Sequence, residues 1–217
     1  MLDRDEYLAA WSRWHGGTGT ERPLVRGWLT LAYALARPLA GLSPVVATAL
    51  GLLVAVVSVG PALAGGIWLL AAGVLVGLSG LLDSLDGALA IGTGRASRRG
   101  FVLDSAVDRL TEAAYAGALW AAGAPGWLAV VFGALCWLPD YLRARAGQAG
   151  VSETGALTVW ERPTRVIMTG LTLVGGGVVS GVGAAGLVVT GGTAVGALLG
   201  AVGVIQLGFS LRRMLAD

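Results

Sequence analysis

Long apolar stretches follow one another along most of this chain, and they constrain its fold more than any other feature. A transmembrane helix needs about 20 consecutive apolar residues. Six stretches of this kind can be placed, at 44–64, 66–90, 100–124, 126–147, 163–183 and 185–211. The composition agrees, because 55% of the residues are hydrophobic and only 13% are charged. The sequence therefore predicts an all-α integral membrane protein with six transmembrane helices.

Arginines alternate with uncharged connections along these stretches. The connections near 60–66, 121–127 and 181–187 carry no charge, whereas the other connections and the tail carry Arg95, Arg98, Arg99, Arg143, Arg145, Arg162, Arg165, Arg212 and Arg213. Positive residues concentrate on the cytoplasmic side of membrane proteins. Because residues 1–22 also lack the apolar region of a signal peptide, we expect a multi-pass protein of the cell (plasma) membrane with both termini in the cytoplasm.

Tryptophans are expected to mark the membrane surfaces. Trp68, Trp120 and Trp127 lie beside the uncharged connections, as an interfacial aromatic belt would require. Trp28 and Trp160 lie near charged segments. We interpret these two as interfacial anchors as well.

The first 43 residues are expected to form a cytoplasmic and interfacial helical segment ahead of the membrane domain, which is assigned to 44–217. Residues 24–40 are apolar but are interrupted by Arg26 and Arg37, so the charge-free run is too short to cross a bilayer. This pattern predicts a helix that lies in the cytoplasmic interface. Upstream, apolar residues at helical spacing fit either a second surface helix or a frayed tail: Tyr7, Leu8, Trp11 and Trp14.

Glycines recur at intervals of four in the last two stretches. These small-xxx-small ladders are Gly177 with Gly181, and Gly192 with Gly196 and Gly200. Small residues at this spacing let membrane helices approach closely. We interpret the ladders as packing features, within one bundle or between subunits.

Four aspartates lie inside two of the apolar stretches. Asp83 and Asp86 are three residues apart and Asp104 and Asp108 are four apart, so each pair shares one helix face. The two helices are sequential neighbours, and the pairs lie at similar distances from the loop that joins them, so we expect them at one depth. Four carboxylates without partners in a membrane would cost on the order of 10 kcal/mol. The cluster therefore predicts bound cations, and carboxylate oxygens suit Mg²⁺, Mn²⁺ and Ca²⁺.

Two classes of function can use such carboxylates, a metal-dependent enzyme and a divalent-cation transporter or channel. A transport pathway should carry polar groups in both halves of the membrane, and here the outer halves are almost purely apolar, which favours an enzyme with a one-sided site. The formal net charge of +2 is too small to indicate nucleic-acid binding. The chain contains no lysine, which excludes a P-loop.

The aspartates and their spacing resemble the signature of the CDP-alcohol phosphotransferases, or CDP-alcohol phosphatidyltransferases, membrane enzymes of phospholipid synthesis. That signature reads D-x-x-D-G-x-x-A-R, eight residues, then G-x-x-x-D-x-x-x-D. Seven of its eight fixed positions are kept, as Asp83, Asp86, Gly87, Ala90, Gly100, Asp104 and Asp108. Ile91 stands where the family has arginine, and Arg95, Arg98 or Arg99 could substitute for the phosphate contact that is lost.

Weaker similarities extend the resemblance over most of the chain. The segment SPVVAT at 43–48 is similar to the start of the family's first span, with Pro44 and Thr48 kept. DYLRARA at 140–146 and ERPTR at 161–165 are similar to segments of actinobacterial phosphatidylinositol-phosphate synthases and their phosphatidylglycerophosphate-synthase relatives.

The resemblance implies a reaction and a set of site residues. An acceptor hydroxyl would attack the β-phosphorus of a CDP-linked lipid such as CDP-diacylglycerol, at the cytoplasmic side, and CMP would be released. Two Mg²⁺ or Mn²⁺ ions would be held by Asp83, Asp86 and Asp104, with Asp108 as the general base and a further metal contact. The family also implies a homodimer and CDP-binding residues, which are Gly87, Ala90, Gly100, Pro44 and Thr48.

The acceptor is a small polar alcohol whose identity the sequence leaves open. Arg143, Arg145, Arg162 and Arg165 cluster on one connection, and arginine suits an acceptor phosphate, as in inositol phosphate or glycerol phosphate. The same arginines also fit ordinary positive-inside anchors. Glu112 could be an outer metal ligand, a substrate contact or a partner of Arg109, and we favour a structural role. Asp140 could contact substrate, and its helical spacing favours pairing with Arg143. A family member that has lost activity is a third alternative, which the intact set of four aspartates argues against.

Overall fold

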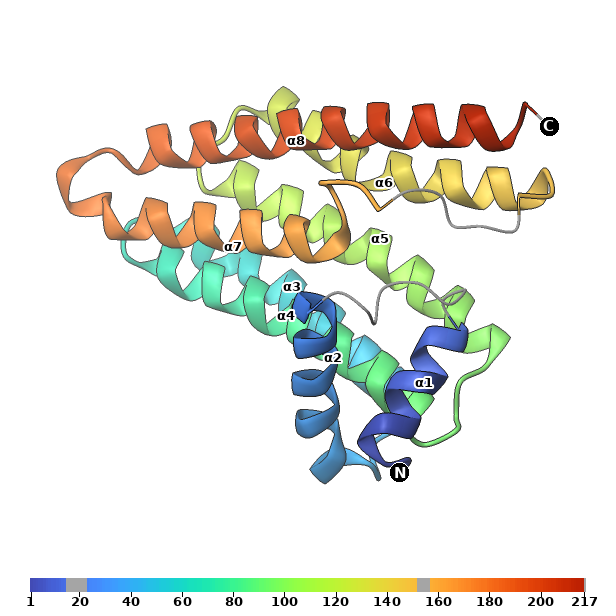
Figure 1. Ribbon diagram of the computed structural model, residues 1–217. Helices are drawn as coiled ribbons and strands as arrows, with labels where there is room; N and C mark the ends of the chain where they lie inside the picture. Colours follow the sequence, from blue (N-terminus) through green and yellow to red (C-terminus); the bar gives the residue numbers. More distant parts are fainter. Residues whose placement is uncertain (15–22, 152–156, 217) are drawn as a thin grey trace. The chain divides into compact units, whose positions relative to one another are not determined.

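Helices account for the regular structure of the described residues in the computed structural model, which are 1–14, 23–151 and 157–216 (Figure 1). The α-helices are α1 (Arg4–Trp14), α2 (Pro23–Ala36), α3 (Pro44–Ala64), α4 (Trp68–Gly92), α5 (Arg98–Ala121), α6 (Gly126–Gln148), α7 (Arg162–Val178) and α8 (Ala185–Met214). Two short 3₁₀ helices, η1 (Arg37–Leu39) and η2 (Ser180–Val182), extend α2 and α7.

The six predicted apolar stretches correspond to helices α3 to α8, which confirms the all-α fold. Within the described residues, α3, α4 and α8 are long and apolar enough to cross a membrane by length and composition. Helices α5 and α6 carry buried or partly buried charges, and α7 has only 17 residues. That all six helices span the membrane stays a prediction for these three.

Two compact units divide the chain, and helices α3, α4 and α5 each contribute residues to both. The first unit contains Met1–Leu53 and Leu78–Asp108, and the second contains Val54–Gly77 and Arg109–Asp217. The four aspartates of the signature belong to the first unit. The division of the chain at residue 43 stays a prediction.

The core of the first unit joins the N-terminal helices to α4. Tyr7 and Leu8 of α1 are buried in a cluster with Leu85 and Leu89 of α4. The Tyr7 ring stacks on Tyr33 of α2 at 5.3 Å, and burial raises the pKa of Tyr7 to about 12, so its hydroxyl stays neutral. The segment is therefore a helix and not a frayed tail, and its place at the membrane surface stays a prediction.

The glycine ladder of α8 lies in the core of the second unit. Helix α8 packs against α6 and α7, and a Cβ atom added at Gly196 would lie 2.6 Å from the Phe132 ring. The Trp160 ring lies against Gly196 and Gly200, its Cβ atom lies against Gly203, and the ring meets Phe132 edge to face at 5.5 Å. These contacts confirm the packing role of the α8 ladder. They also show that Trp160, which is 0% exposed, is a core residue, so its interpretation as an interfacial anchor is wrong.

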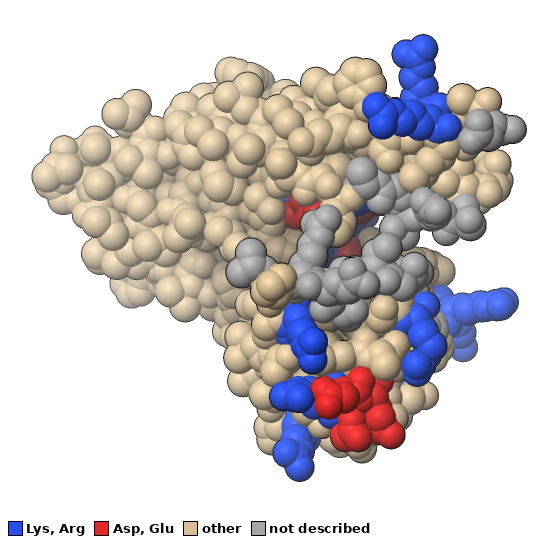
Figure 2. Space-filling model, viewed as in Figure 1, with Lys and Arg blue, Asp and Glu red and all other residues tan. Residues whose placement is uncertain are grey.

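The uncharged ends of the helices present an apolar outer surface. Trp68, Trp120 and Trp127 are 61%, 65% and 69% exposed, as expected for residues that face lipid. In the view of Figure 2, the surface formed by η2 and the adjoining ends of α7 and α8 shows no charged atoms. That this end of the helices faces the exterior stays a prediction.

Candidate active site

A short reversal between α4 and α5 brings the two aspartate pairs together. Gly94 has φ +68°, a left-handed conformation that favours glycine, and it turns the chain after the end of α4. The Ser97 hydroxyl then accepts a hydrogen bond of 3.0 Å from the Gly100 backbone N–H at the start of α5. A Cβ at Gly100 would lie 3.1 Å from this hydroxyl, so the glycine of the signature leaves room for the cap.

Three of the four aspartates form one carboxylate cluster. Asp83 of α4 and Asp104 and Asp108 of α5 each offer an oxygen, and these oxygens all lie within 4.8 Å of one another. The three side chains are partly buried, so their mutual repulsion is only partly screened by water. An all-oxygen donor set of this size and charge fits a hard divalent cation such as Mg²⁺ or Mn²⁺.

Asp86 lies outside this three-residue cluster, although the sequence groups all four aspartates. It is 5% exposed, and its Oδ2 accepts a hydrogen bond of 2.5 Å from the Thr48 hydroxyl of α3. Three residues along a helix turn a side chain by about 300°, so Asp86 is rotated by about 60° from Asp83. Thr48 therefore touches and orients a carboxylate of the site, a contact that the sequence alone does not reveal.

The predicted CDP-binding residues belong to the same three helices as these carboxylates and Thr48, which are α3, α4 and α5. Gly87 is exposed, and a Cβ added there would meet no atom within 4 Å, so a ligand can approach the α4 backbone next to Asp86. Pro44 opens α3, and its carbonyl lies 3.0 Å from the Thr48 hydroxyl. Ala90 is half-buried one turn after Asp86. Their contact with CDP stays a prediction.

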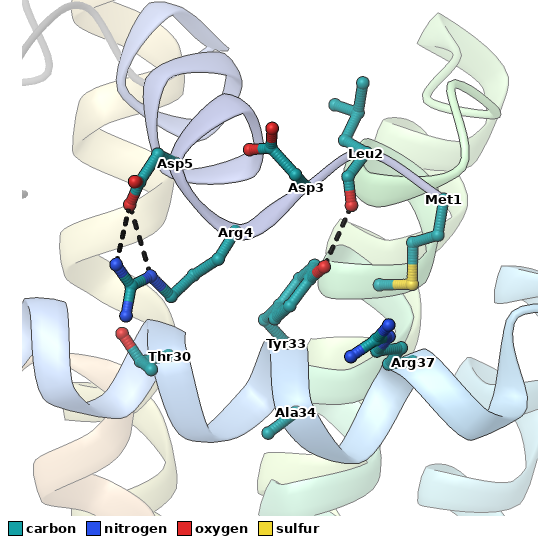
Figure 3. A pocket seen from close by; sticks show the side chains of 9 residues that line it. All are labelled: Met1, Leu2, Asp3, Arg4, Asp5, Thr30, Tyr33, Ala34 and Arg37. Atoms are coloured by element: carbon teal, nitrogen blue, oxygen red, sulfur yellow. Dashed lines mark hydrogen bonds and ion pairs between the residues drawn. The ribbon is translucent and has the colours of Figure 1, made fainter.

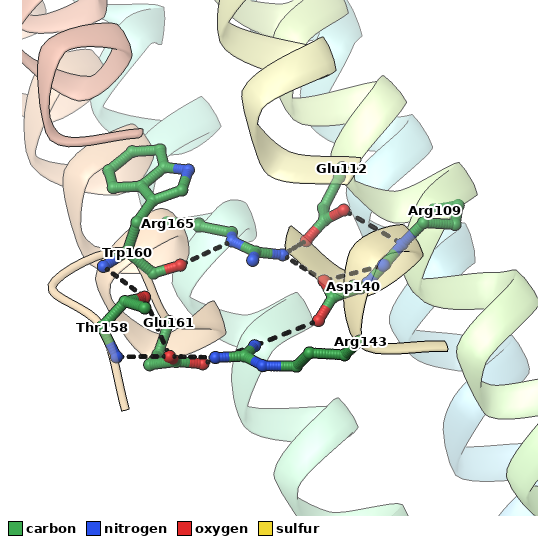
Figure 4. Close-up of polar contacts among 8 residues, drawn as sticks. All are labelled: Arg109, Glu112, Asp140, Arg143, Thr158, Trp160, Glu161 and Arg165. Atoms are coloured by element: carbon green, nitrogen blue, oxygen red, sulfur yellow. Dashed lines mark hydrogen bonds and ion pairs between the residues drawn. The ribbon is translucent and has the colours of Figure 1, made fainter. Parts of the chain in front are cut away.

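A network of three arginines and three carboxylates lies in the second unit (Figure 4). Arg165 is 1% exposed, and its Nη1 atom lies 2.5 Å from Glu112 Oε1 and 2.8 Å from Asp140 Oδ2. Arg109 bridges the same two carboxylates, at 3.2 Å and 2.8 Å. Two predicted pairings are thereby confirmed, Glu112 with Arg109 and Asp140 with Arg143, the second at 3.5 Å.

The four arginines assigned to the acceptor differ in their surroundings. Arg143 contacts Glu161 at 2.7 Å, and Arg165 is held between Glu112 and Asp140. Arg145 is exposed and donates to Gln148 at 2.6 Å, and Arg162 is the first residue of α7. Acceptor binding by these four residues stays a prediction.

The fold and the carboxylate cluster together define a helical membrane protein with a candidate metal site. Residues 42–200 match the family model described as CDP-alcohol phosphatidyltransferase. This chain belongs to the CDP-alcohol phosphatidyltransferase family, a family of membrane transferases of phospholipid biosynthesis. The family membership removes the transporter alternative.

Relatives named as inositol phosphate-lipid synthases match a little under half of this chain. An archaetidylinositol phosphate synthase of Pyrococcus horikoshii is 39% identical over 99 residues, which are 45% of this chain and 52% of that protein. A phosphatidylinositol phosphate synthase of Mycobacteroides abscessus is 38% identical over 104 residues, 44% of this chain and 46% of that protein. The chain thus spans about half the length of the curated relatives that it matches.

Two solved structures of the Mycobacterium tuberculosis phosphatidylinositol phosphate synthase resemble the whole fold. The first, with CDP-DAG bound, has a TM-score of 0.64 at 27% identity and covers 83% of this chain and 92% of that chain. The second, in complex with manganese and citrate, has a TM-score of 0.65 at 26% identity and covers 83% of this chain and 88% of that chain. A manganese-bound relative is consistent with a metal site at the aspartate cluster.

Proposed function

We propose that this protein transfers the phosphatidyl group of CDP-diacylglycerol to a hydroxyl group of inositol phosphate and releases CMP. The observation that carries the proposal is the cluster of Asp83, Asp104 and Asp108, built by signature residues of a chain that belongs to the family. The donor is supported by the solved relative with CDP-DAG bound. The acceptor is supported by relatives that are named inositol phosphate-lipid synthases.

The carboxylates of the cluster have different tasks in this proposal. Asp83, Asp86 and Asp104 would hold two Mg²⁺ or Mn²⁺ ions, and Thr48 fixes the orientation of Asp86 through its hydrogen bond. Bound there, the ions would neutralise the diphosphate and stabilise the charge that develops on the leaving CMP. Asp108 takes the proton of the acceptor hydroxyl while the hydroxyl oxygen forms a bond to the β-phosphorus. The bond from that phosphorus to the bridging oxygen breaks, and CMP leaves with the electron pair.

The membrane placement belongs to the same proposal. Helices α3 to α8 would all cross the plasma membrane, with both termini and the active site on the cytoplasmic side, and two copies of the chain would form a homodimer. The alternation of charged and uncharged connections supports the orientation. A soluble acceptor would then reach the carboxylates from the cytoplasm, while the acyl chains of the donor stay in lipid.

The acceptor phosphate is proposed to bind the arginines of the connection between α6 and α7. Arg143 and Arg165 already contact carboxylates, so the phosphate would bind beside those ion pairs. A hydrogen bond to a charged group contributes about 1.5–3 kcal/mol, which corresponds to a factor of about ten or more in rate.

An acceptor panel tests the proposed function. Purified protein with Mg²⁺ or Mn²⁺ and CDP-diacylglycerol receives inositol phosphate, glycerol phosphate, inositol or serine in separate reactions, and CMP is measured by chromatography. We expect inositol phosphate to release CMP at least about tenfold faster than inositol, because inositol lacks the phosphate. If none of the four acceptors leads to CMP release, the transferase function is contradicted and the inactive alternative fits. A preference for glycerol phosphate would overturn the acceptor assignment alone.

A further inference from the structure

The last turn of α1 and the end of α4 enclose a hollow of about 300 Å³ within the first unit. The described residues that line it are Ala10 and Arg13 of α1, Ile91 of α4 and Ala96 of the following loop. Arg13 is the charged member of this set, and the other three present apolar side chains. The hollow therefore combines one guanidinium with an apolar wall, which suits a ligand that is anionic and partly apolar.

The position of α1 on α4 is set by specific contacts. The Leu2 backbone N–H donates to the Gly92 carbonyl at 2.7 Å, and the Tyr33 hydroxyl donates to the Leu2 carbonyl at 3.0 Å (Figure 3). A Cβ at Gly92 would lie 2.8 Å from the Met1 methyl carbon, so the side chain of Met1 packs directly on this glycine. These contacts, together with the buried Tyr7, hold α1 on the helix that carries Asp83 and Asp86.

The hollow lies farther along α4 than the carboxylates, in the direction of the C-terminal end of this helix. Ile91 comes five residues after Asp86, about 7.5 Å farther along the α4 axis. Gly87 and Ile91 are four residues apart and share a helix face, and the space over Gly87 is open. A phosphate-bearing ligand that extends from the aspartates past Gly87 reaches the hollow that Arg13 lines.

Ile91 cannot bind an anion, although the signature has arginine at this position. Its apolar side chain instead packs against the core that α1 and α2 form with α4. Arg95 is already committed, because its Nε donates to the Thr93 hydroxyl at 2.7 Å and its Nη2 donates to the Ala40 carbonyl at 2.7 Å. Arg13 is exposed and makes no hydrogen bond or ion pair with another described residue.

We propose that Arg13 binds the donor, with its guanidinium on a phosphate of the CDP-linked lipid. This inference rests on the proposed function and assigns one of its binding residues. The apolar Ile91 lets α1 dock on α4. The docked helix then places Arg13 beside position 91, where the signature has its arginine. Guanidinium groups suit this task because their planar fork matches phosphate oxygens.

Affinity for CDP in the presence of Mn²⁺ tests the role of Arg13, and calorimetry on the purified full chain measures it without turnover. Arg13→Ala should raise the Kd about 10- to 100-fold, the effect of losing one charge-assisted contact. The Kd of Arg13→Lys should lie between those of the wild type and Arg13→Ala. In steady-state assays Arg13→Ala should raise the KM for CDP-diacylglycerol more than it lowers kcat. Ile91→Arg in the Arg13→Ala background should restore part of the affinity.

Arg4→Ala is the matched control, because Arg4 lies on the same helix, pairs with Asp5 at 3.1 Å and does not line this hollow. We expect it to bind CDP as the wild type does. Wild-type affinity in Arg13→Ala, or an equal loss in Arg4→Ala, would overturn the assignment of Arg13. Either result would leave CMP release by the wild type intact, whereas failure of the proposed function would appear as no CMP release with CDP affinity still dependent on Arg13.

Discussion

Replacing Asp108 with asparagine is expected to lower the rate of CMP release by about 10²- to 10⁴-fold, the usual contribution of a general base. Asparagine has nearly the same shape as aspartate but cannot take the proton of the acceptor hydroxyl. Asp83 and Asp104, the other members of the cluster, stay in place in this variant. Affinity for CDP should therefore change by only a few fold, which we would measure in the same preparations as the kcat for CMP release.

Asp5→Asn is the control for this substitution, because Asp5 lies in α1 with a side chain that is 73% exposed and pairs with Arg4. It should release CMP at the wild-type rate. A wild-type rate in Asp108→Asn would contradict the assignment of Asp108 as the base. Parallel loss of CDP affinity and rate would show that Asp108 acts mainly through its metal contact and not as the base.

Replacing Arg165 with methionine should destabilise the protein by about 3–5 kcal/mol, the effect of breaking a buried ion pair on one side. Arg165 and Glu112 both have side chains that are 1% exposed. Without the guanidinium, Arg109 is the ion-pair partner that remains to Glu112 within the described part of the chain, and Asp140 loses a contact of 2.8 Å. For a chain of this size the melting temperature should fall by about 10 °C, measured by differential scanning fluorimetry in detergent.

Arg145→Met serves as the comparison for Arg165→Met, because it removes an exposed arginine that donates a hydrogen bond to Gln148 at 2.6 Å. It should change the melting temperature by no more than about 2 °C. Adding Glu112→Gln to Arg165→Met should recover part of the loss, because the buried negative charge is then removed as well. Equal melting temperatures for Arg165→Met and Arg145→Met would show that the network does not stabilise the fold.

Much of the local structure follows from the sequence, because it depends on periodicity and charge along one helix. The apolar stretches locate α3 to α8, and helical spacing pairs Glu112 with Arg109 and Asp140 with Arg143. The carboxylate cluster is also anticipated, since two aspartate pairs on neighbouring antiparallel helices lie at one depth.

Contacts between distant segments could not be predicted in this way. Trp160 looks like an interfacial residue until Gly200 and Gly203 of α8 supply the surface that buries it. Asp86 looks equivalent to Asp83 in the sequence, but in the structure its carboxylate accepts a hydrogen bond from Thr48 of α3. In both cases the deciding partner is more than 30 residues away, and no pattern in the sequence specifies which helices pack together.

The central claim is that the signature aspartates form the metal site of a phosphatidyl transferase. Electron paramagnetic resonance of Mn²⁺ bound to the purified protein tests it most directly, with CMP release from CDP-diacylglycerol and inositol phosphate measured in the same samples. We expect Asp83→Asn to lose both bound Mn²⁺ and CMP release, while Asp5→Asn keeps both. Wild-type Mn²⁺ binding together with wild-type CMP release in Asp83→Asn would contradict it.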